Sequence, residues 1–258
     1  MTGPAGPGSL TVVGLGPGDK QLRTPAADAA LAAATDIVGY QTYLDLAGPF
    51  RAEQRVHVSD NREEIARARH AFALAAGGAA VAVVSSGDPG VFAMAAAVLE
   101  ALEAADDPAW HQVALRILPG VSAAQAAAAL AGAPLGHDFC ALSLSDNLKP
   151  WAEIERRLAL VCEADLVIAL YNPRSKARPD QFGRALALLR GRRAPDTVVV
   201  LGRDVGRLDE QLTITTLAAL SPEQVDMRTV VIIGSSRTRR IARPDGREWV
   251  YTPRSYPG

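Results

Sequence analysis

Several residue types are scarce in this chain, and each scarcity argues against a class of protein. With two cysteines among 258 residues, neither a disulfide-stapled fold nor a cysteine-rich zinc site is indicated. No apolar run approaches the roughly 20 residues that span a bilayer, and residues 1–9 lack the apolar core of a signal peptide. We therefore expect a cytoplasmic protein that does not contact a membrane, with Cys140 and Cys162 as buried free thiols.

Excess charge of either sign is also lacking. The formal net charge is −1, which argues against a nucleic-acid partner held by bulk charge. The four histidines do not show metal-ligand spacing, so no metal is expected. Only three of the 27 basic residues are lysines, namely Lys20, Lys149 and Lys176, so a lysine here is more informative than a scattered arginine.

Short apolar runs alternate with segments of helical periodicity, which is typical of an α/β fold whose sheets carry helices on both faces. Strands are expected at 10–15, 36–39, 81–84, 113–118, 139–144, 166–170, 198–201 and 230–233. Helices are expected at 25–33, 93–102, 121–130, 151–162 and 180–189. A further helix is expected after a cap at Asp60-Asn61, and Gly77 should stop it.

The simplest arrangement is two α/β domains with a cleft between them. Residues 132–136, with the sequence GAPLG, contain two glycines and a proline, which interrupt regular structure and indicate the junction. This predicts a disordered segment at 1–9, an N-terminal domain at 10–131 and a C-terminal domain at 132–258. The basic stretch after Ser235 has few periodic apolar residues, which indicates a tail or an edge element.

Three glycine-bounded turns, each directly after an expected strand, are the most informative motifs. They read GLGPGD at 14–19, SSGDPGVF at 85–92 and LPGVSA at 118–123. Such turns place backbone amides and the Asp88 carboxylate at the carboxyl edge of a sheet, where open α/β folds bind small molecules.

In this order the three turns resemble the tetrapyrrole methylase family, whose members use S-adenosylmethionine. The resemblance implies that Asp88 and nearby backbone amides hold the ammonium and carboxylate of the cofactor's methionine end. It also implies a homodimer with the cofactor in the cleft. The cofactor-binding residues that it implies are Gly14, Pro17, Gly87, Asp88, Val91, Phe92, Ser122, Ala123, Tyr171 and Asn172.

Other interpretations of these turns remain open at this point. The first turn could be a dinucleotide-binding loop, but Pro17 has no N–H to donate and the helix starts only near Thr24. Asp88 could be a helix N-cap, and Ser122 could be another, and either role is compatible with cofactor binding.

Two further stretches, SLSDNLKPW at 143–151 and YNPRS at 171–175, resemble the branch of the family that methylates carbon 17 of precorrin-3B and contracts its ring. Contraction needs a group that takes the bridge hydroxyl proton and a group that stabilises the departing lactone oxygen. The catalytic candidates are Asp146, Ser145, Lys149 and Lys176. Arginines just beyond strand ends would orient the carboxylates of the substrate, and the candidates are Arg174, Arg178 and Arg203.

Competing functions are kept beside this one. The chain could be a tetrapyrrole methylase acting at another carbon, on a cobalt-precorrin or on a different acceptor. It could also be a tetrapyrrole binder without catalysis, although the intact Gly-Asp-Pro turn at 87–89 argues against that. Asp146 with Asn147 could be a plain turn, and either candidate lysine could be a solvated surface residue.

Overall fold

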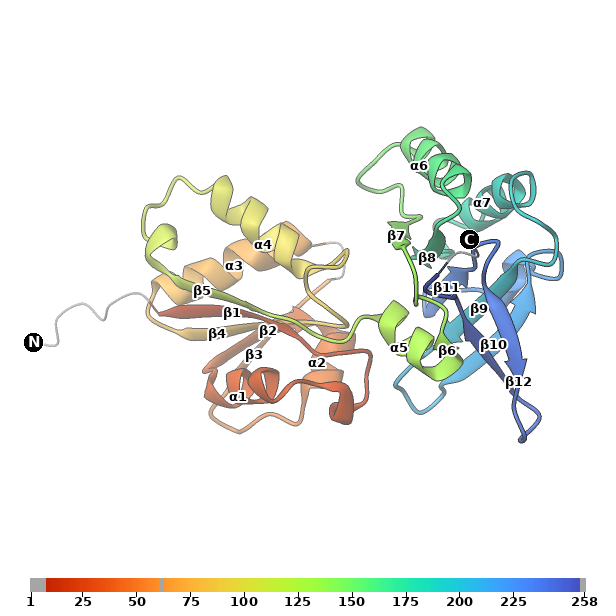
Figure 1. Cartoon of the computed structure of the whole chain (residues 1–258). Helices are drawn as coiled ribbons and strands as arrows, with labels where there is room; N and C mark the ends of the chain where they lie inside the picture. The colour runs from red at the N-terminus through yellow and green to blue at the C-terminus, as the bar shows by residue number, and fades with distance from the viewer. Residues whose placement is uncertain (1–7, 61–62, 256–258) are drawn as a thin grey trace, which may run out of the picture. The chain divides into compact units, whose positions relative to one another are not determined.

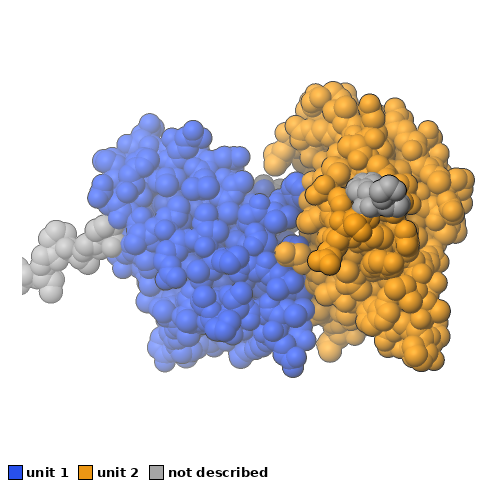
Figure 2. All heavy atoms as spheres, viewed as in Figure 1, with its two compact units in different colours: residues 1–122 blue, residues 123–258 orange. Residues whose placement is uncertain are grey.

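The structure, a computed structural model, describes residues 8–60 and 63–255 and divides into two compact units. Residues 1–122 form unit 1 and residues 123–258 form unit 2 (Figure 2). Each unit contains a five-stranded sheet packed with helices, so the expected α/β class is confirmed. Residues 1–7 of the expected disordered segment lie outside the described residues, whereas Ser9 already begins a strand.

The sheet of unit 1 is entirely parallel, with the strand order β3-β2-β4-β1-β5. Its strands are β1 (Ser9–Gly14), β2 (Asp36–Tyr40), β3 (Arg55–Ser59), β4 (Ala80–Ser85) and β5 (Ala114–Leu118). Because parallel strands end at the same edge, the three glycine turns that follow β1, β4 and β5 share one edge of this sheet.

Helices cover both faces of this sheet, α3 and α4 on one face and α1 and α2 on the other (Figure 1). They are α1 (Pro25–Ala33), α2 (Gln41–Ala47), α3 (Glu64–Ala76) and α4 (Met94–Glu103). On the first face Phe72 of α3 is fully buried and stacks on Trp110, with 5.1 Å between ring centroids. On the second face Leu31 and Leu44 pack against the buried valines and alanines of the strands.

Helix starts were predicted with mixed success. Thr24 caps α1 as its sequence predicts, since its Oγ1 accepts the Ala27 N–H at 3.2 Å and a proline follows at the first helical position. The cap predicted at Asp60-Asn61 is wrong at Asp60: α3 begins after Glu63, and the Asp60 N–H donates to the Glu63 carboxylate. Asn61 lies outside the described residues.

The sequence analysis missed α2 and β3. No side-chain hydrogen bond caps α2, which starts directly at the end of β2 and leaves no turn signal. The edge strand β3 exposes Val56 and Val58, so it lacks the buried apolar run that marked the other strands. Backbone pairing along β2 and a charged cluster at Asp36, rather than apolar burial, hold β3 to its neighbour.

Asp36 is fully buried at the start of β2 and accepts hydrogen bonds from three side chains. Arg55 donates through Nε and Nη2, both at 2.8 Å, and His57 Nε2 and Thr35 Oγ1 also lie at 2.8 Å. His57 Nδ1 in turn shares a hydrogen bond of 3.0 Å with His70 of α3. Burial would raise the pKa of the Asp36 carboxyl, but these donors outweigh it and lower the pKa from 3.8 to about 2.

Replacing Asp36 with Asn should lower the free energy of unfolding at pH 7 by about 2 kcal/mol, because the native state then loses a carboxylate whose pKa falls on folding. Since the native pKa is the lower one, this stabilisation is present above the unfolded pKa of about 4 and is lost as the pH falls toward 2. Urea unfolding at several pH values measures it. The control is Asp45→Asn, because Asp45 is an exposed residue of α2. An equal loss of unfolding free energy in both variants would contradict the prediction.

The main sheet of unit 2 has the strand order β10-β9-β11-β8-β7. Its strands are β7 (Phe139–Ser143), β8 (Val167–Tyr171), β9 (Val198–Arg203), β10 (Gln211–Thr216) and β11 (Thr229–Ile233). Strands β7 and β8 are parallel, and β11 runs antiparallel to both β8 and β9, so β7, β8 and β9 end at the same edge. Helices α6 (Trp151–Glu163) and α7 (Gln181–Arg190) bury their apolar sides against this sheet.

Helix α5 (Ala123–Ala131) corrects the predicted domain boundary. It was assigned to the N-terminal domain, but it contacts β9, β10 and β11 and belongs to unit 2. Its buried alanines fit closely over the sheet, since a Cβ on Gly202 would lie 2.6 Å from Ala127 Cβ. Gly132 therefore follows the end of a helix inside unit 2 and Gly136 lies in the bend after β6, so neither glycine marks a junction between units.

The sequence analysis predicted either a tail or an edge element after Ser235, and this stretch forms an edge element. Strands β12 (Arg239–Ala242) and β13 (Glu248–Tyr251) pair as a hairpin, and β13 adds to the short strand β6 (Gly132–Ala133). The thiols of Cys140 and Cys162 are free, and burial raises the pKa of Cys140 to about 11. In the described part of the chain, no helix combines the length and apolar character needed to cross a membrane.

Candidate functional site

The glycine turns of unit 1 form one connected backbone structure at the carboxyl edge of its sheet. Gly16 donates its N–H to Gly87 O at 3.2 Å, and Gly87 donates its N–H to Gly16 O at 2.7 Å. The third turn is close enough that a Cβ on Gly120 would lie 2.2 Å from Gly87 O. A Cβ on Gly14 would lie 2.7 Å from Gly120 N, so glycine is required where the three turns meet.

Asp88 connects two of these turns. Its Oδ1 accepts the Gly90 N–H at 2.8 Å and its Oδ2 accepts the Gly120 N–H at 3.1 Å. The alternative role as helix N-cap is wrong, because α4 begins after Ala93. Asp88 is half-buried and a carboxylate has about four acceptor positions, so further hydrogen bonds to a ligand remain open to it.

The other cofactor candidates of unit 1 surround this junction. Pro17 and Ser122 are buried, Val91 is half-buried, and the Ser122 Cα is 3.9 Å from where a Gly87 Cβ would stand. Phe92 has a φ of 54° and an exposed fraction of 48%. A left-handed, bulky residue that exposes an aromatic ring indicates a functional constraint, because neither feature stabilises the fold.

Replacing Gly120 with Ala should destabilise the protein by about 2 kcal/mol or more, since the new Cβ would overlap Gly87 O and force the turns apart. Thermal unfolding measures the effect. The matched control is Gly191→Ala at the end of α7, where φ is −77° and no atom would come closer than 3.6 Å to the new Cβ. A Gly120→Ala variant as stable as this control would contradict the packing described here.

In unit 2 the parallel strands β7 and β8 place two candidate stretches side by side, with Ser143 in register with Tyr171. Ser143 Oγ accepts a hydrogen bond from Asn172 Nδ2 at 3.0 Å and another from the Ser145 N–H at 3.3 Å. Asn172 has a φ of 52°, in the left-handed region. The sequence analysis included Ser143 in the stretch at 143–151 but did not choose it as a site candidate, although its place as the last residue of an apolar strand was a usable signal.

The predicted catalytic residues follow these strands. Asp146 is half-buried, and its Oδ2 accepts a hydrogen bond from Gln181 Nε2 at 3.0 Å, a partner that the sequence analysis missed. Burial lowers the pKa of the half-buried Lys149 ammonium, and the charge of Arg157 lowers it further. Lys176 is exposed. Neither lysine has a carboxylate within 4.0 Å among the described residues, so both cations are available to an anionic ligand.

The predicted substrate-binding arginines all have partners inside the chain. Arg174 donates to Pro222 O at 3.1 Å. Arg203 pairs with Asp226 at 3.2 Å and lies 3.7 Å from the buried Asp204. Arg178 is buried and donates to backbone carbonyls. Their contact with a substrate stays a prediction, and the internal bonds show that each also holds a loop.

The end of β8 is also tied to α5. The Tyr171 hydroxyl accepts the Ala124 N–H at 3.1 Å, in the first turn of the helix that Ala123 begins. This bond satisfies one of the amides that a helix N-terminus leaves without an intrahelical partner. Tyr171, Ala123 and Asn172 therefore lie near one another in unit 2.

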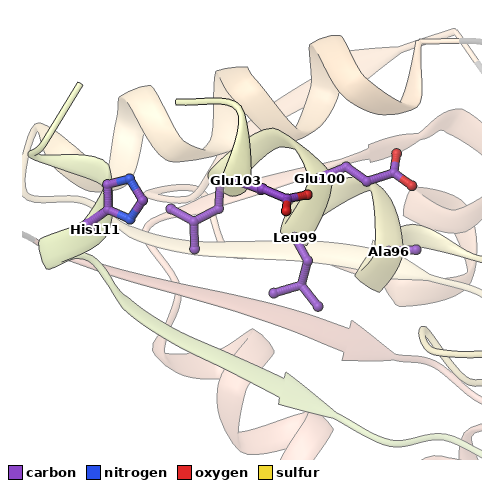
Figure 3. A pocket seen from close by; sticks show the side chains of 6 residues that line it. Ala96, Leu99, Glu100, Glu103 and His111 are labelled. Atoms are coloured by element: carbon purple, nitrogen blue, oxygen red, sulfur yellow. The ribbon is translucent and has the colours of Figure 1, made fainter. Parts of the chain in front are cut away.

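A surface hollow of about 620 Å³ lies along α4, away from these edges (Figure 3). It is lined by Ala96, Leu99, Glu100, Leu102, Glu103 and His111. These residues belong to α4 and to the short helix that precedes β5, and none of them comes from a candidate motif. Within residues 8–60 and 63–255, no group of three or more histidine, cysteine or acidic side chains could hold a metal ion.

Comparison with known proteins identifies the family to which this sequence and fold are similar. Residues 9–221 match the family model described as Tetrapyrrole (Corrin/Porphyrin) Methylases. A precorrin-3B C(17)-methyltransferase of a Sinorhizobium species is 53% identical over 252 residues, 97% of this chain and 98% of that protein. The cobalamin biosynthesis protein CobIJ of Mycobacterium bovis is 50% identical over 97% of this chain, which spans 49% of CobIJ.

A solved structure of the methyltransferase CobJ has a TM-score of 0.90 to this chain, with 52% identity over 95% of this chain and all of that one. The match extends through both units and therefore includes the glycine turns of unit 1 and the β7 and β8 ends of unit 2. On this evidence the chain belongs to the tetrapyrrole (corrin/porphyrin) methylase family.

Proposed function

We propose that this chain is an S-adenosylmethionine-dependent C-methyltransferase of cobalamin biosynthesis, which methylates precorrin-3B at carbon 17 with ring contraction to precorrin-4. The observation that carries the proposal is the identity of 53% over nearly the full length of both proteins with a precorrin-3B C(17)-methyltransferase. A cytoplasmic homodimer belongs to the same proposal. The nucleic-acid and membrane partners that the sequence analysis disfavoured have no place in it.

The glycine edge of unit 1 has the chemistry to hold S-adenosylmethionine. When bound, the sulfonium supplies an electrophilic methyl group, and the carbon nucleophile takes it as the S–C electron pair returns to sulfur. Asp88 would accept a hydrogen bond from the ammonium of the cofactor's methionine end, and the Asp88 N–H would donate to the cofactor's carboxylate, since the N–H groups of Gly87, Gly90 and Val91 already have acceptors in the chain. The exposed ring of Phe92 supplies apolar surface at the same turn. Gly14, Gly16 and Gly120 let the backbones approach closely.

The β7 and β8 ends of unit 2 have the chemistry for the contraction step. The bridge hydroxyl must give up its proton, and Asp146, with one oxygen held by Gln181, is our candidate to accept it. The departing lactone oxygen gains negative charge, which the Lys149 ammonium would stabilise. The hydroxyl of Ser145 could bond the same oxygen. Each group follows β7 directly, so one loop supplies the proton acceptor and the charge stabiliser.

Methyl transfer itself needs alignment more than covalent help. Orienting a carbon nucleophile against the methyl group in a site without water can supply several kcal/mol of the barrier reduction. The substrate carries many carboxylates, for which Lys176 and the rim arginines Arg174 and Arg203 are candidate partners. Arg203 already pairs with Asp226, so a substrate carboxylate would have to share this arginine.

The test of the proposal is incubation of the purified chain with S-adenosylmethionine and enzymatically prepared precorrin-3B, followed by mass and absorption spectra. We expect the product to gain one methyl group and to show the spectrum of a contracted ring. Turnover only of a cobalt-loaded analogue would transfer the proposal to a cobalt-containing acceptor; a Salmonella typhimurium relative that is 42% identical is named as a probable cobalt-factor III C(17)-methyltransferase. No binding of S-adenosylmethionine in calorimetry would overturn it.

Asp146→Asn should lower kcat by about 100-fold or more and leave the Kd for S-adenosylmethionine unchanged, because a general base contributes that much to the reaction step alone. Asn keeps the size of the side chain and can still bond Gln181 after an amide rotation. Single-turnover kinetics and calorimetry make the two measurements. Asp180→Asn is the control, since Asp180 is exposed and its side chain does not cap α7. A kcat within twofold of wild type for Asp146→Asn would exclude Asp146 as the base.

A further inference from the structure

Arg178 has an unusual environment for an arginine. Only 8% of its surface is exposed, and its Nη1 donates to two backbone carbonyls, Leu144 O at 3.4 Å and Asn172 O at 3.3 Å. These carbonyls belong to the segments that follow β7 and β8. One guanidinium therefore joins the two candidate segments of unit 2.

Both segments are constrained at the points where Arg178 holds them. Leu144 immediately precedes Ser145 and Asp146, so fixing its carbonyl fixes where those side chains start. Asn172 has a left-handed φ of 52°, a conformation that Asn adopts more readily than most non-glycine residues and that nearby hydrogen bonds can stabilise. Its side chain is held by Ser143 Oγ and its carbonyl by Arg178, so two bonds stabilise that conformation.

The loop that carries Arg178 folds back on itself to place the guanidinium. The Ser175 N–H donates to Arg178 O at 3.2 Å, and the Arg178 N–H donates to Ser175 O at 3.1 Å and reaches Ser175 Oγ at 3.1 Å. On the far side, Nη2 lies 3.4 Å from Met227 Sδ. The side chain is thus enclosed on several sides.

A second buried arginine shows what is particular about Arg178. Arg193 is 9% exposed and also donates to two carbonyls, Val161 O in the last turn of α6 and Leu166 O just before β8. Arg193 has a carboxylate partner in Asp165, whereas no carboxylate lies within 4.0 Å of Arg178 among residues 8–60 and 63–255. Arg67 of α3 is 3% exposed and likewise has no carboxylate within 4.0 Å in the described part of the chain, so what sets Arg178 apart is that its guanidinium joins the two candidate segments of unit 2.

The geometry points to Arg178 as a positioning residue, which fixes the loops bearing Asp146 and Asn172 in the arrangement that the reaction needs and keeps that edge positively charged for an anionic substrate. The inference rests on the proposed methyltransferase function and replaces direct substrate contact by Arg178 with action through the loops. Both carbonyls accept from Nη1, whose two N–H bonds have fixed directions in the guanidinium plane, whereas the freely rotating ammonium of a shorter lysine would hold the carbonyls less well and would lose the contact with Met227.

The test compares Arg178→Met and Arg178→Lys with Arg193→Met. We expect Arg178→Met to lower kcat with precorrin-3B by about 100-fold, since a displacement of about 1 Å can have that effect, with little change in the Kd for S-adenosylmethionine. Arg178→Lys should recover part of kcat, because it keeps the charge and one hydrogen bond. Arg193→Met should lower the melting temperature at least as much and keep kcat within twofold of wild type.

Hydrogen exchange gives a readout that does not depend on turnover. Amides at 144–146 and 172–175 should exchange at least tenfold faster in Arg178→Met than in wild type, and at the wild-type rate in Arg193→Met. If wild type fails to methylate precorrin-3B, the proposed function fails, and exchange still decides whether Arg178 places these loops. Unchanged exchange with unchanged kcat in Arg178→Met, or an equal loss of kcat in Arg193→Met, would overturn the inference.

Discussion

The close backbone contact of Gly16, Gly87 and Gly120 is the constraint on which the candidate site of unit 1 depends. Parallel strands β1, β4 and β5 deliver three chain segments to one edge, and only residues without a Cβ let those segments touch. The hydrogen-bonded pair Gly16 and Gly87 then fixes the turns relative to the sheet. Asp88 can hold two turns together only because this contact brings the Gly120 amide within its reach.

Unit 2 uses side chains where unit 1 uses glycine backbone. Ser143, Asn172 and Arg178 hold two strand ends at a fixed spacing, and Gln181 holds one oxygen of Asp146. Polar side chains can be exchanged for others of similar reach more easily than a glycine can be replaced. An edge built from polar side chains suits the recognition of one acceptor among related ring compounds. An edge built from glycine backbone suits the binding of a ligand that a whole family shares.

The sequence predicted the regular elements wherever local signals were strong. Buried apolar runs predicted β1, β4 and β8, and Thr24 with Pro25 predicted the start of α1. Elements held by long-range polar contacts were missed, because the bond from Arg55 to Asp36 that secures β3 leaves no periodic pattern.

For the site, the motifs located the right edges, but spacing along the chain could not show which partner each side chain takes. Arg178 lies six residues from Asn172 and 34 from Leu144, and only the fold brings both carbonyls to it. The domain boundary failed for a related reason. The helix at 123–131 is alanine-rich on every side, so its sequence did not indicate which sheet it would cover.

The pairing of β13 with β6 has a consequence for the order of events during synthesis. Val250 pairs with Gly132, and Thr252 Oγ1 donates to Pro134 O at 2.6 Å, so the start of unit 2 is completed by residues made more than a hundred positions later. Unit 1 contains all of its strands by residue 118 and can fold while the ribosome is still elongating the chain. The main sheet of unit 2 is complete by Ile233, but its small sheet of β6, β12 and β13 must wait for β13 to emerge, and until then the β6 edge is open to pairing with other chains.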